Sequence, residues 1–128
     1  MILVIGGAFQ GKKEYTKQQF GISDTDITDG ATCELDAVYH AVCVSHFHEW
    51  IKRMIAQGSE SVPLAEKLWQ TNPDVILISN ELGYGVVPVD AFDREYREAT
   101  GRICTWLASR AKEVHRVVCG IGTVIKHD

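Results

Sequence analysis

Short, continuous apolar runs alternate with longer stretches of mixed polarity along the chain. Runs of four or five apolar residues suit strands that are buried on both faces, whereas the longer mixed stretches suit helices with one apolar side. The pattern predicts strands at residues 2–5, 26–29, 75–79 and 115–119. It predicts helices at residues 12–20, 34–57 with a break near 43–45, 64–71 and 91–111.

Capping residues and glycines indicate where several of these elements begin and end. Ser45 and Asp90 are residue types whose side chains accept a hydrogen bond from a free backbone N–H group, so each predicts a helix that starts at the next residue. A glycine-rich segment, 120–122, follows the strand at 115–119. That strand is therefore predicted to be the last one.

Strands that are apolar throughout and separated by helices are typical of a parallel sheet with helices on both faces. In such a sheet, ligands bind beyond the carboxyl ends of the strands. The loops that follow Ile5, Ser79 and Cys119 are therefore expected to converge at one edge. The predicted fold class is α/β with a mostly parallel central sheet.

The composition fits one domain and excludes several functional classes. A chain of 128 residues with 45% hydrophobic content buries about two thirds of its surface on folding, so a single domain over residues 1–128 needs no metal or disulfide. The net charge of −4 argues against a protein that binds nucleic acid through its phosphates. The apolar runs are too short to span a membrane.

The cysteines and the first residues predict a cytoplasmic protein. The four cysteines are scattered and form no Cys-x-x-Cys pair, which argues against a zinc knuckle and favours reduced thiols. Met1 leads directly into a strand without a basic segment, so no secretory signal is expected.

The first loop matches the G-x-x-x-x-G-K core of a phosphate-binding loop, with a strand before it and a helix after it. In such a loop, backbone N–H groups and the lysine bind the phosphates of a nucleotide. The matching residues are Gly6, Gly7, Ala8, Phe9, Gln10, Gly11 and Lys12. An ordinary glycine turn is the alternative. Lys13 stands where such loops carry the serine or threonine that ligates Mg²⁺, so the motif predicts nucleotide binding more strongly than Mg²⁺-dependent phosphoryl transfer.

The segment "SNELGYGVVP", at residues 79–88, resembles the adenosylcobinamide kinase / adenosylcobinamide-phosphate guanylyltransferase family of cobalamin biosynthesis. The similarity continues through "DAFDREYREATGRICTWLASRAKEVHRVVCGI" and is also present in the opening "ILVIGGAFQGK". It implies a three-layer P-loop NTPase-like fold, a kinase or nucleotidyltransferase that uses ATP or GTP with Mg²⁺, a corrinoid substrate and a homo-oligomer.

The middle of the chain departs from that family. Family members are longer, and they have a strand leading into an Asp-Cys-Leu-Thr segment with a Walker-B-like aspartate, which this sequence lacks. They also have a helix whose histidine carries the guanylyl group and is followed by basic residues. The nearest counterpart here is "SHFHEWIKRM". The chain is identified as a shortened member.

Two carboxylates are candidates for metal binding. Glu81 follows a strand at the edge that carries the phosphate loop, where it could hold Mg²⁺ or orient a hydroxyl group, or else cap a helix. Asp29 ends a short strand and could replace the missing Walker-B aspartate, although an Asp-Gly pair is often only a turn. Gly83 and Gly85 are expected to form turns with positive φ that keep their loop close to a ligand.

Two histidines are candidates for the nucleophile that accepts the guanylyl group. His46 shares a helical face with Arg53, whose planar guanidinium suits phosphate oxygens, whereas His48 faces another side together with Lys52. This favours His46, with Arg53 among the nucleotide-binding residues. A histidine packed on Trp50 at the edge of the core is the alternative.

Three functions therefore remain open. The first is a nucleotide-dependent transferase that resembles the cobinamide kinase / guanylyltransferase family. The second is a nucleotide-binding accessory or regulatory protein that kept the fold and lost catalysis, as Lys13 and the missing middle would suggest. The third is a small α/β protein without a nucleotide role, which would make both glycine motifs accidental.

Overall fold

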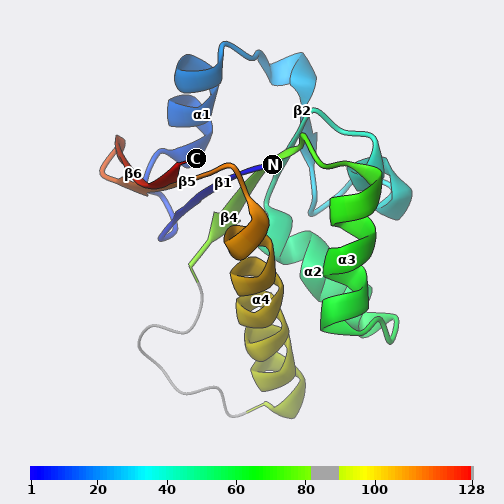
Figure 1. Cartoon of the computed structure of the whole chain (residues 1–128). Coiled ribbons are helices and arrows are strands. Elements are labelled where there is room, and N and C mark those ends of the chain that lie inside the picture. Colours follow the sequence, from blue (N-terminus) through cyan, green and yellow to red (C-terminus); the bar gives the residue numbers. More distant parts are fainter. Residues whose placement is uncertain (82–89, 128) are drawn as a thin grey trace.

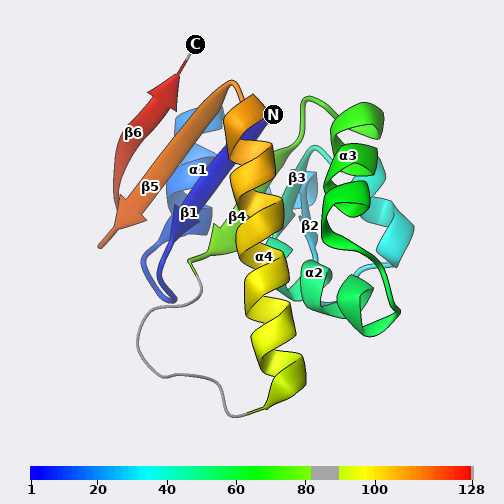
Figure 2. The same cartoon turned by 60° about the horizontal axis from the view of Figure 1, so that its bottom comes forward.

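The structure, a computed structural model, describes residues 1–81 and 90–127. Its strands form one sheet in the order β2-β3-β4-β1-β5-β6 (Figure 2). The five strands β1 to β5 run parallel, and β6 pairs with β5 in the antiparallel direction. The strands are β1 (Ile2–Gly6), β2 (Ile27–Asp29), β3 (Cys43–Ser45), β4 (Ile76–Asn80), β5 (Glu113–Val118) and β6 (Ile121–His127).

Helices cover both faces of this sheet, which gives three layers (Figure 1). Helix α1 lies on one face, and α2, α3 and α4 lie on the other. The α-helices are α1 (Lys12–Phe20), α2 (Phe47–Ala56), α3 (Ser61–Thr71) and α4 (Ala91–Arg110), and the short 3₁₀ helices are η1 (Asp24–Asp26) and η2 (Leu35–Tyr39). The arrangement confirms the predicted three-layer, mostly parallel α/β fold.

Alternation of side chains along the strands explains why both faces are covered. Leu77 in β4 and Val114 in β5 belong to the larger core beneath α2, α3 and α4. Ile78 and Val117, on the opposite face of the same strands, pack in a smaller core beneath α1. Because successive side chains of a strand point to opposite faces, a strand buried on both faces must be apolar throughout.

Several predicted boundaries are confirmed. Helix α1 spans the predicted residues and ends at Gly21, which adopts the left-handed conformation that favours glycine. Helix α4 starts where expected, because the Asp90 side chain accepts a hydrogen bond of 2.8 Å from the backbone N–H of Phe92. Within the described residues, no helix combines the length and the apolar character that crossing a membrane requires.

The prediction of a mostly helical segment at residues 34–57, broken near 43–45, is confirmed for its second half, where α2 spans Phe47–Ala56, and was wrong for the first half. Residues 35–39 form the short 3₁₀ helix η2, and the expected helix break at 43–45 is the buried strand β3, which pairs with β2 and β4. Three residues are too few to show a strand period, so burial inside the sheet decided the conformation. Ser45 is also not the helix cap: it ends β3, and His46 occupies the capping position with φ 51°.

The strand at 115–119 is not the last one. The glycine-rich segment turns the chain back into β6, which forms the edge of the sheet beside β5. Most β6 side chains are exposed, so the strand lacks the apolar run that marked the others. Gly122 is required there, because a Cβ atom at this position would lie 2.1 Å from the ring of Tyr15 in α1.

Candidate functional site

At the carboxyl edge of the sheet, the loop after β1 contacts the turn after β5, and the end of β1 contacts Glu81, the described residue that follows β4. The backbone N–H of Glu81 donates to the carbonyl oxygen of Gly6 over 2.8 Å. On the other side, Gln10 joins the loops by two bonds of 2.7 Å, since its backbone carbonyl accepts from Gly120 N–H and its side-chain oxygen accepts from Cys119 N–H. The first loop is therefore fastened to Glu81 at its start and to the β5–β6 turn through Gln10.

The first loop contains residues with positive φ and a very close approach to β5, both of which favour glycine. Gly11 has φ 80° and leads into α1, and Phe9 has φ 60° with its ring fully exposed to solvent. Gly6 sits so close to β5 that a Cβ atom would lie 2.5 Å from the carbonyl oxygen of Val117. The glycines in the motif therefore serve close backbone approach and left-handed geometry.

Lys12 bends back over this loop. It is the first residue of α1, its side chain is largely buried, and its ammonium group donates to the carbonyl oxygen of Gly7 over 2.7 Å. Burial lowers the pKa of Lys12, and the negative charge of Glu81 opposes that shift. The geometry holds a cation directly inside the loop. Lys13 is half exposed and lies 3.7 Å from Asp24.

A cavity of about 320 Å³ opens beside the loop. Four elements contribute to its walls: the loop itself, the start of α1, the β3–α2 junction and the end of β4. The residues with polar side chains are Gln10, Lys12, Lys13, Glu14, Ser45, His46, His48 and Asn80. The structure thus brings together the phosphate loop and both candidate histidines, which lie far apart in sequence.

His46 stands at the junction of β3 and α2, with its side chain about half exposed. Its Nδ1 atom lies 2.9 Å from the Oδ1 atom of Asp29, which also accepts a hydrogen bond from the backbone N–H of Ala31. Partial burial works to raise the pKa of Asp29, but these two hydrogen bonds outweigh burial and the pKa is lowered. Asp29 is therefore a carboxylate at neutral pH.

His48, the second residue of α2, is buried, with its ring in edge contact with that of His46 at 5.9 Å between centroids. Its Nδ1 atom accepts a hydrogen bond of 3.1 Å from the backbone N–H of Asn80. Burial lowers the pKa of His48 to about 4, so the ring is neutral at pH 7. With Nδ1 as the acceptor, the proton of this neutral ring is on Nε2.

The structure directs Arg53 away from the cavity. One guanidinium nitrogen donates to the carbonyl oxygen of Gly30 over 2.7 Å, and another donates to the carbonyl oxygen of Cys33. These bonds fasten the segment after β2 onto α2. Nucleotide binding by Arg53 stays a prediction, although its fork of donors is occupied by backbone in this conformation. Lys52 lies over the ring of Tyr96 in α4, 5.4 Å from its centroid.

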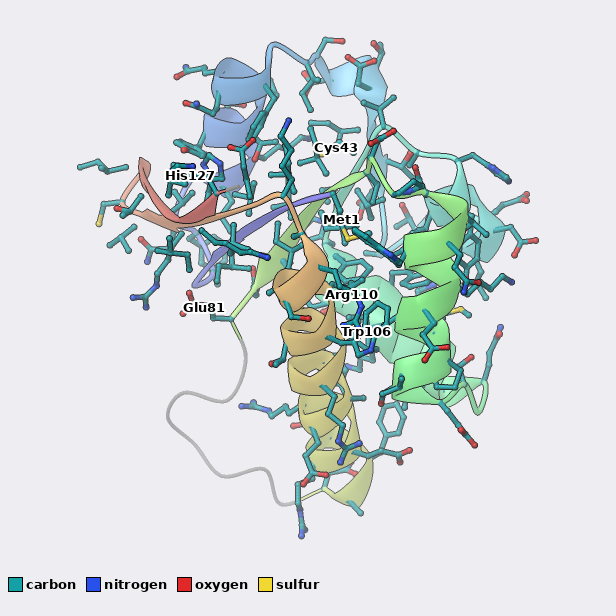
Figure 3. All side chains as sticks on the ribbon, viewed as in Figure 1. Met1, Cys43, Glu81, Trp106, Arg110 and His127 are labelled. Carbon is teal, nitrogen blue, oxygen red and sulfur yellow. The ribbon has the colours of Figure 1, made fainter. Side chains whose placement is uncertain are left out.

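Glu81 lies where β4 ends (Figure 3) and forms a two-bond ion pair with Arg116 of β5, at 2.8 and 3.2 Å. The pair lines a second cavity of about 390 Å³, to which α4 contributes Thr100 and Cys104. Asn80 borders both cavities, whereas Glu81 borders only the second. The end of β4 therefore borders two different cavities: one contains the ion pair of Glu81 and Arg116, and the other contains Lys12 and the two histidines.

The described residues do not form a ready metal site. Asp29 ends the edge strand β2 and Glu81 follows β4, so β3 separates them. Among the residues that the structure describes, no group of three or more His, Cys, Asp and Glu side chains could hold an ion. The first cavity offers two ammonium groups and one carboxylate, which suits an anion better than a cation. Metal binding by Asp29 or Glu81 stays a prediction.

Sequence reasoning missed four polar residues at this edge: Ser45, Asn80, Gln10 as a link between loops, and Arg116 as the partner of Glu81. Asn80 could have been found, because it is the last residue of β4 and comes two positions after the apolar run. The predicted turns at Gly83 and Gly85 lie outside the described residues, as does most of the Gly-Tyr-Gly-Val-Val-Pro segment.

Comparison with known proteins gives one matching family. The model of the family described as cobinamide kinase / cobinamide phosphate guanyltransferase matches residues 35–125. The bifunctional adenosylcobalamin biosynthesis proteins CobU of Escherichia coli (strain K12) and Salmonella typhimurium (strain LT2) are each 46% identical to this chain over 52 residues. The aligned segment is 41% of this chain and 29% of each relative, so less than a third of each curated protein is matched.

Proposed function

Because the chain belongs to the cobinamide kinase / cobinamide phosphate guanyltransferase family, we propose that it is a nucleotide-dependent transferase of cobalamin biosynthesis. It uses ATP or GTP and transfers a phosphoryl or guanylyl group to a corrinoid substrate. One observation carries the proposal: the glycine loop, Lys12 and two histidines border one cavity of a size that suits nucleotide phosphates.

In this proposal the loop holds the phosphates of the nucleotide. The backbone N–H groups at the start of α1 and the ammonium group of Lys12 face an anion, and Lys12 exchanges the carbonyl oxygen of Gly7 for a phosphate oxygen. Lys13 adds a second positive charge at the rim of the cavity. Mg²⁺, when it accompanies the nucleotide, would neutralise phosphate charge, and no step here depends on a protein-held ion.

The guanylyl group is carried by His46 rather than His48. A nucleophilic imidazole needs an unprotonated ring nitrogen with a lone pair that faces the phosphate. In His48 the unprotonated nitrogen is bound to the backbone N–H of Asn80, so attack by it would break that bond. Its Nε2 atom carries the proton and lies 3.8 Å from Oε1 of Glu49. His46 is the more exposed of the two rings.

The test is to incubate the protein with GTP and to measure its intact mass. A covalent GMP adduct that is labile in acid is expected in the wild type and in His48→Asn, and it is lost in His46→Asn. An adduct lost only in His48→Asn would transfer the role to His48. Nucleotide binding without any adduct would refute guanylyl transfer and leave the alternative, a nucleotide-binding accessory protein of the same fold.

We also propose that the protein is cytoplasmic and forms a homo-oligomer. All four cysteines are free, which suits the reducing cytoplasm. The resemblance to the family suggests a homo-oligomer, which light scattering of the purified chain would measure.

A further inference from the structure

The end of β2 packs closely against the β3–α2 junction, which contains His46. The backbone N–H of Gly30 donates to the carbonyl oxygen of Ser45 over 2.7 Å. A Cβ atom at Gly30 would lie 2.8 Å from the carbonyl oxygen of His46 and 3.0 Å from that of Ser45. Only glycine allows this approach, which brings the neighbouring Asp29 carboxylate within hydrogen-bond distance of the His46 ring.

His46 itself has a backbone conformation that costs free energy. Its φ of 51° and ψ of 43° are left-handed, a region in which the Cβ atom of a residue comes too close to the following carbonyl oxygen. The surrounding structure fixes that conformation, because β3 precedes the residue and the carbonyl oxygen of His46 accepts the first hydrogen bonds of α2, from Glu49 and Trp50. Residues held in this way are concentrated at functional sites.

The hydrogen bond between the two side chains decides which nitrogen of His46 is protonated. A carboxylate has no proton to donate, so Nδ1 of His46 must be the donor and must carry the hydrogen. The neutral ring then has its lone pair on Nε2, on the side away from Asp29. In a Ser-His-Asp triad, the aspartate likewise accepts a hydrogen bond from Nδ1 of the histidine and so fixes the tautomer of the ring.

We propose that Asp29 is a positioning residue for His46: it holds the tautomer in which Nε2 is the free nucleophile. This assignment rests on the proposed guanylyl transfer through His46. The positive charge of Lys13 also works to lower the pKa of Asp29, which favours the ionised carboxylate that the hydrogen bond needs.

In the guanylyl transfer step, His46 displaces pyrophosphate from GTP. The Nε2 lone pair attacks the α-phosphorus of GTP, an N–P bond forms, and the bond between the α-phosphorus and the bridging oxygen breaks so that pyrophosphate leaves. The ring now carries a positive charge, and its Nδ1 proton stays in the hydrogen bond to Asp29. When an ionised phosphate oxygen of the acceptor attacks the same phosphorus, an O–P bond forms, the N–P bond breaks, and its electron pair returns to Nε2 to give the neutral ring again.

Two substitutions separate the position of the carboxylate from its charge. Asp29→Ala removes the acceptor, so His46 loses its tautomer preference and adduct formation slows by about 100-fold, a moderate loss because the pair is half exposed. Asp29→Asn keeps an oxygen that Ala31 N–H and His46 can both use, so the tautomer is retained and the loss is smaller. Asp36→Asn, on the exposed surface of η2, is the matched control.

¹⁵N NMR spectra of the ligand-free protein report which nitrogen of His46 is protonated. A merely structural role of Asp29 would leave this tautomer unchanged when Asp29 is substituted. The expected result is a proton on Nδ1 in the wild type, Asp29→Asn and Asp36→Asn, and a shift of the proton towards Nε2 in Asp29→Ala. A wild-type proton on Nε2, or adduct formation in Asp29→Ala as fast as in Asp36→Asn, would overturn the proposal. If the tautomers are as expected but the wild type forms no adduct, the positioning stands and guanylyl transfer fails.

Discussion

The buried ring of His48 makes the stability of the protein depend on pH between about 4 and 6.5. In the unfolded chain a histidine has its ordinary pKa, whereas burial lowers the pKa of His48 to about 4 in the folded protein. Between these values the unfolded chain binds a proton that the folded protein does not. The stability is therefore fully present above pH 6.5 and is lost as the pH falls towards 4.

The magnitude follows from the two pKa values. Lowering the pH from 7 to 5 is expected to remove about 2 kcal/mol of the free energy of unfolding. The His48 side chain is only 6% exposed, so solvent screens little of this effect. The carboxylates with lowered pKa values, Asp24 and Asp29, are ionised in both states across this range and lose their contribution only at lower pH.

Urea unfolding of the wild type and of His48→Asn at pH 7 and pH 5 measures this difference. The asparagine oxygen can take over the hydrogen bond from Asn80 N–H, and it does not titrate. The loss between the two pH values should be smaller in the variant by about 2 kcal/mol. An equal loss in the two proteins would refute the reasoning, and His46→Asn, at a half-exposed ring, serves as the control.

Two further substitutions test the loop. Lys13→Ser restores a magnesium ligand in place of a positive charge, so the ratio of nucleotide affinities with and without Mg²⁺ should rise by about tenfold; titrations in Mg²⁺ and in EDTA measure it, and an unchanged ratio would contradict the role of Lys13. Gly6→Ala places a Cβ atom 2.5 Å from the Val117 carbonyl oxygen and should destabilise the protein by about 1–3 kcal/mol. The matched control, Gly101→Ala in α4, has open space around it and should stabilise by about 0.5–1 kcal/mol in the same urea experiment.

The sequence predicted best where local chemistry decides the structure. The residues of α1 and the capping by Asp90 follow from glycine and cap preferences that act within a few residues. The contacts of the first loop with Glu81 and with the turn after β5 follow from parallel strands, because these must all end at one edge.

The elements that sequence reasoning missed depend on distant contacts. Strand β3 has three residues and is set by its two neighbours in the sheet, and β6 is an exposed edge strand with little apolar signal. The pairing of Asp29 with His46 joins residues 17 positions apart through the β2–β3 register. Helical spacing placed Arg53 beside His46, but the left-handed conformation of His46 and the carbonyl oxygens near Gly30 direct the guanidinium elsewhere.

Calorimetric titration of the protein with ATP and with GTP tests the central claim, that the loop at residues 6–12 binds nucleotide phosphates. The wild type and Lys112→Ala, whose exposed lysine lies at the opposite edge of the sheet beside Met1, should bind at least one of the two nucleotides with equal affinity. Lys12→Ala should bind it about 10- to 100-fold more weakly, as expected for a lost charged hydrogen bond. No binding of either nucleotide by the wild type, or equal affinity in Lys12→Ala, would contradict the account.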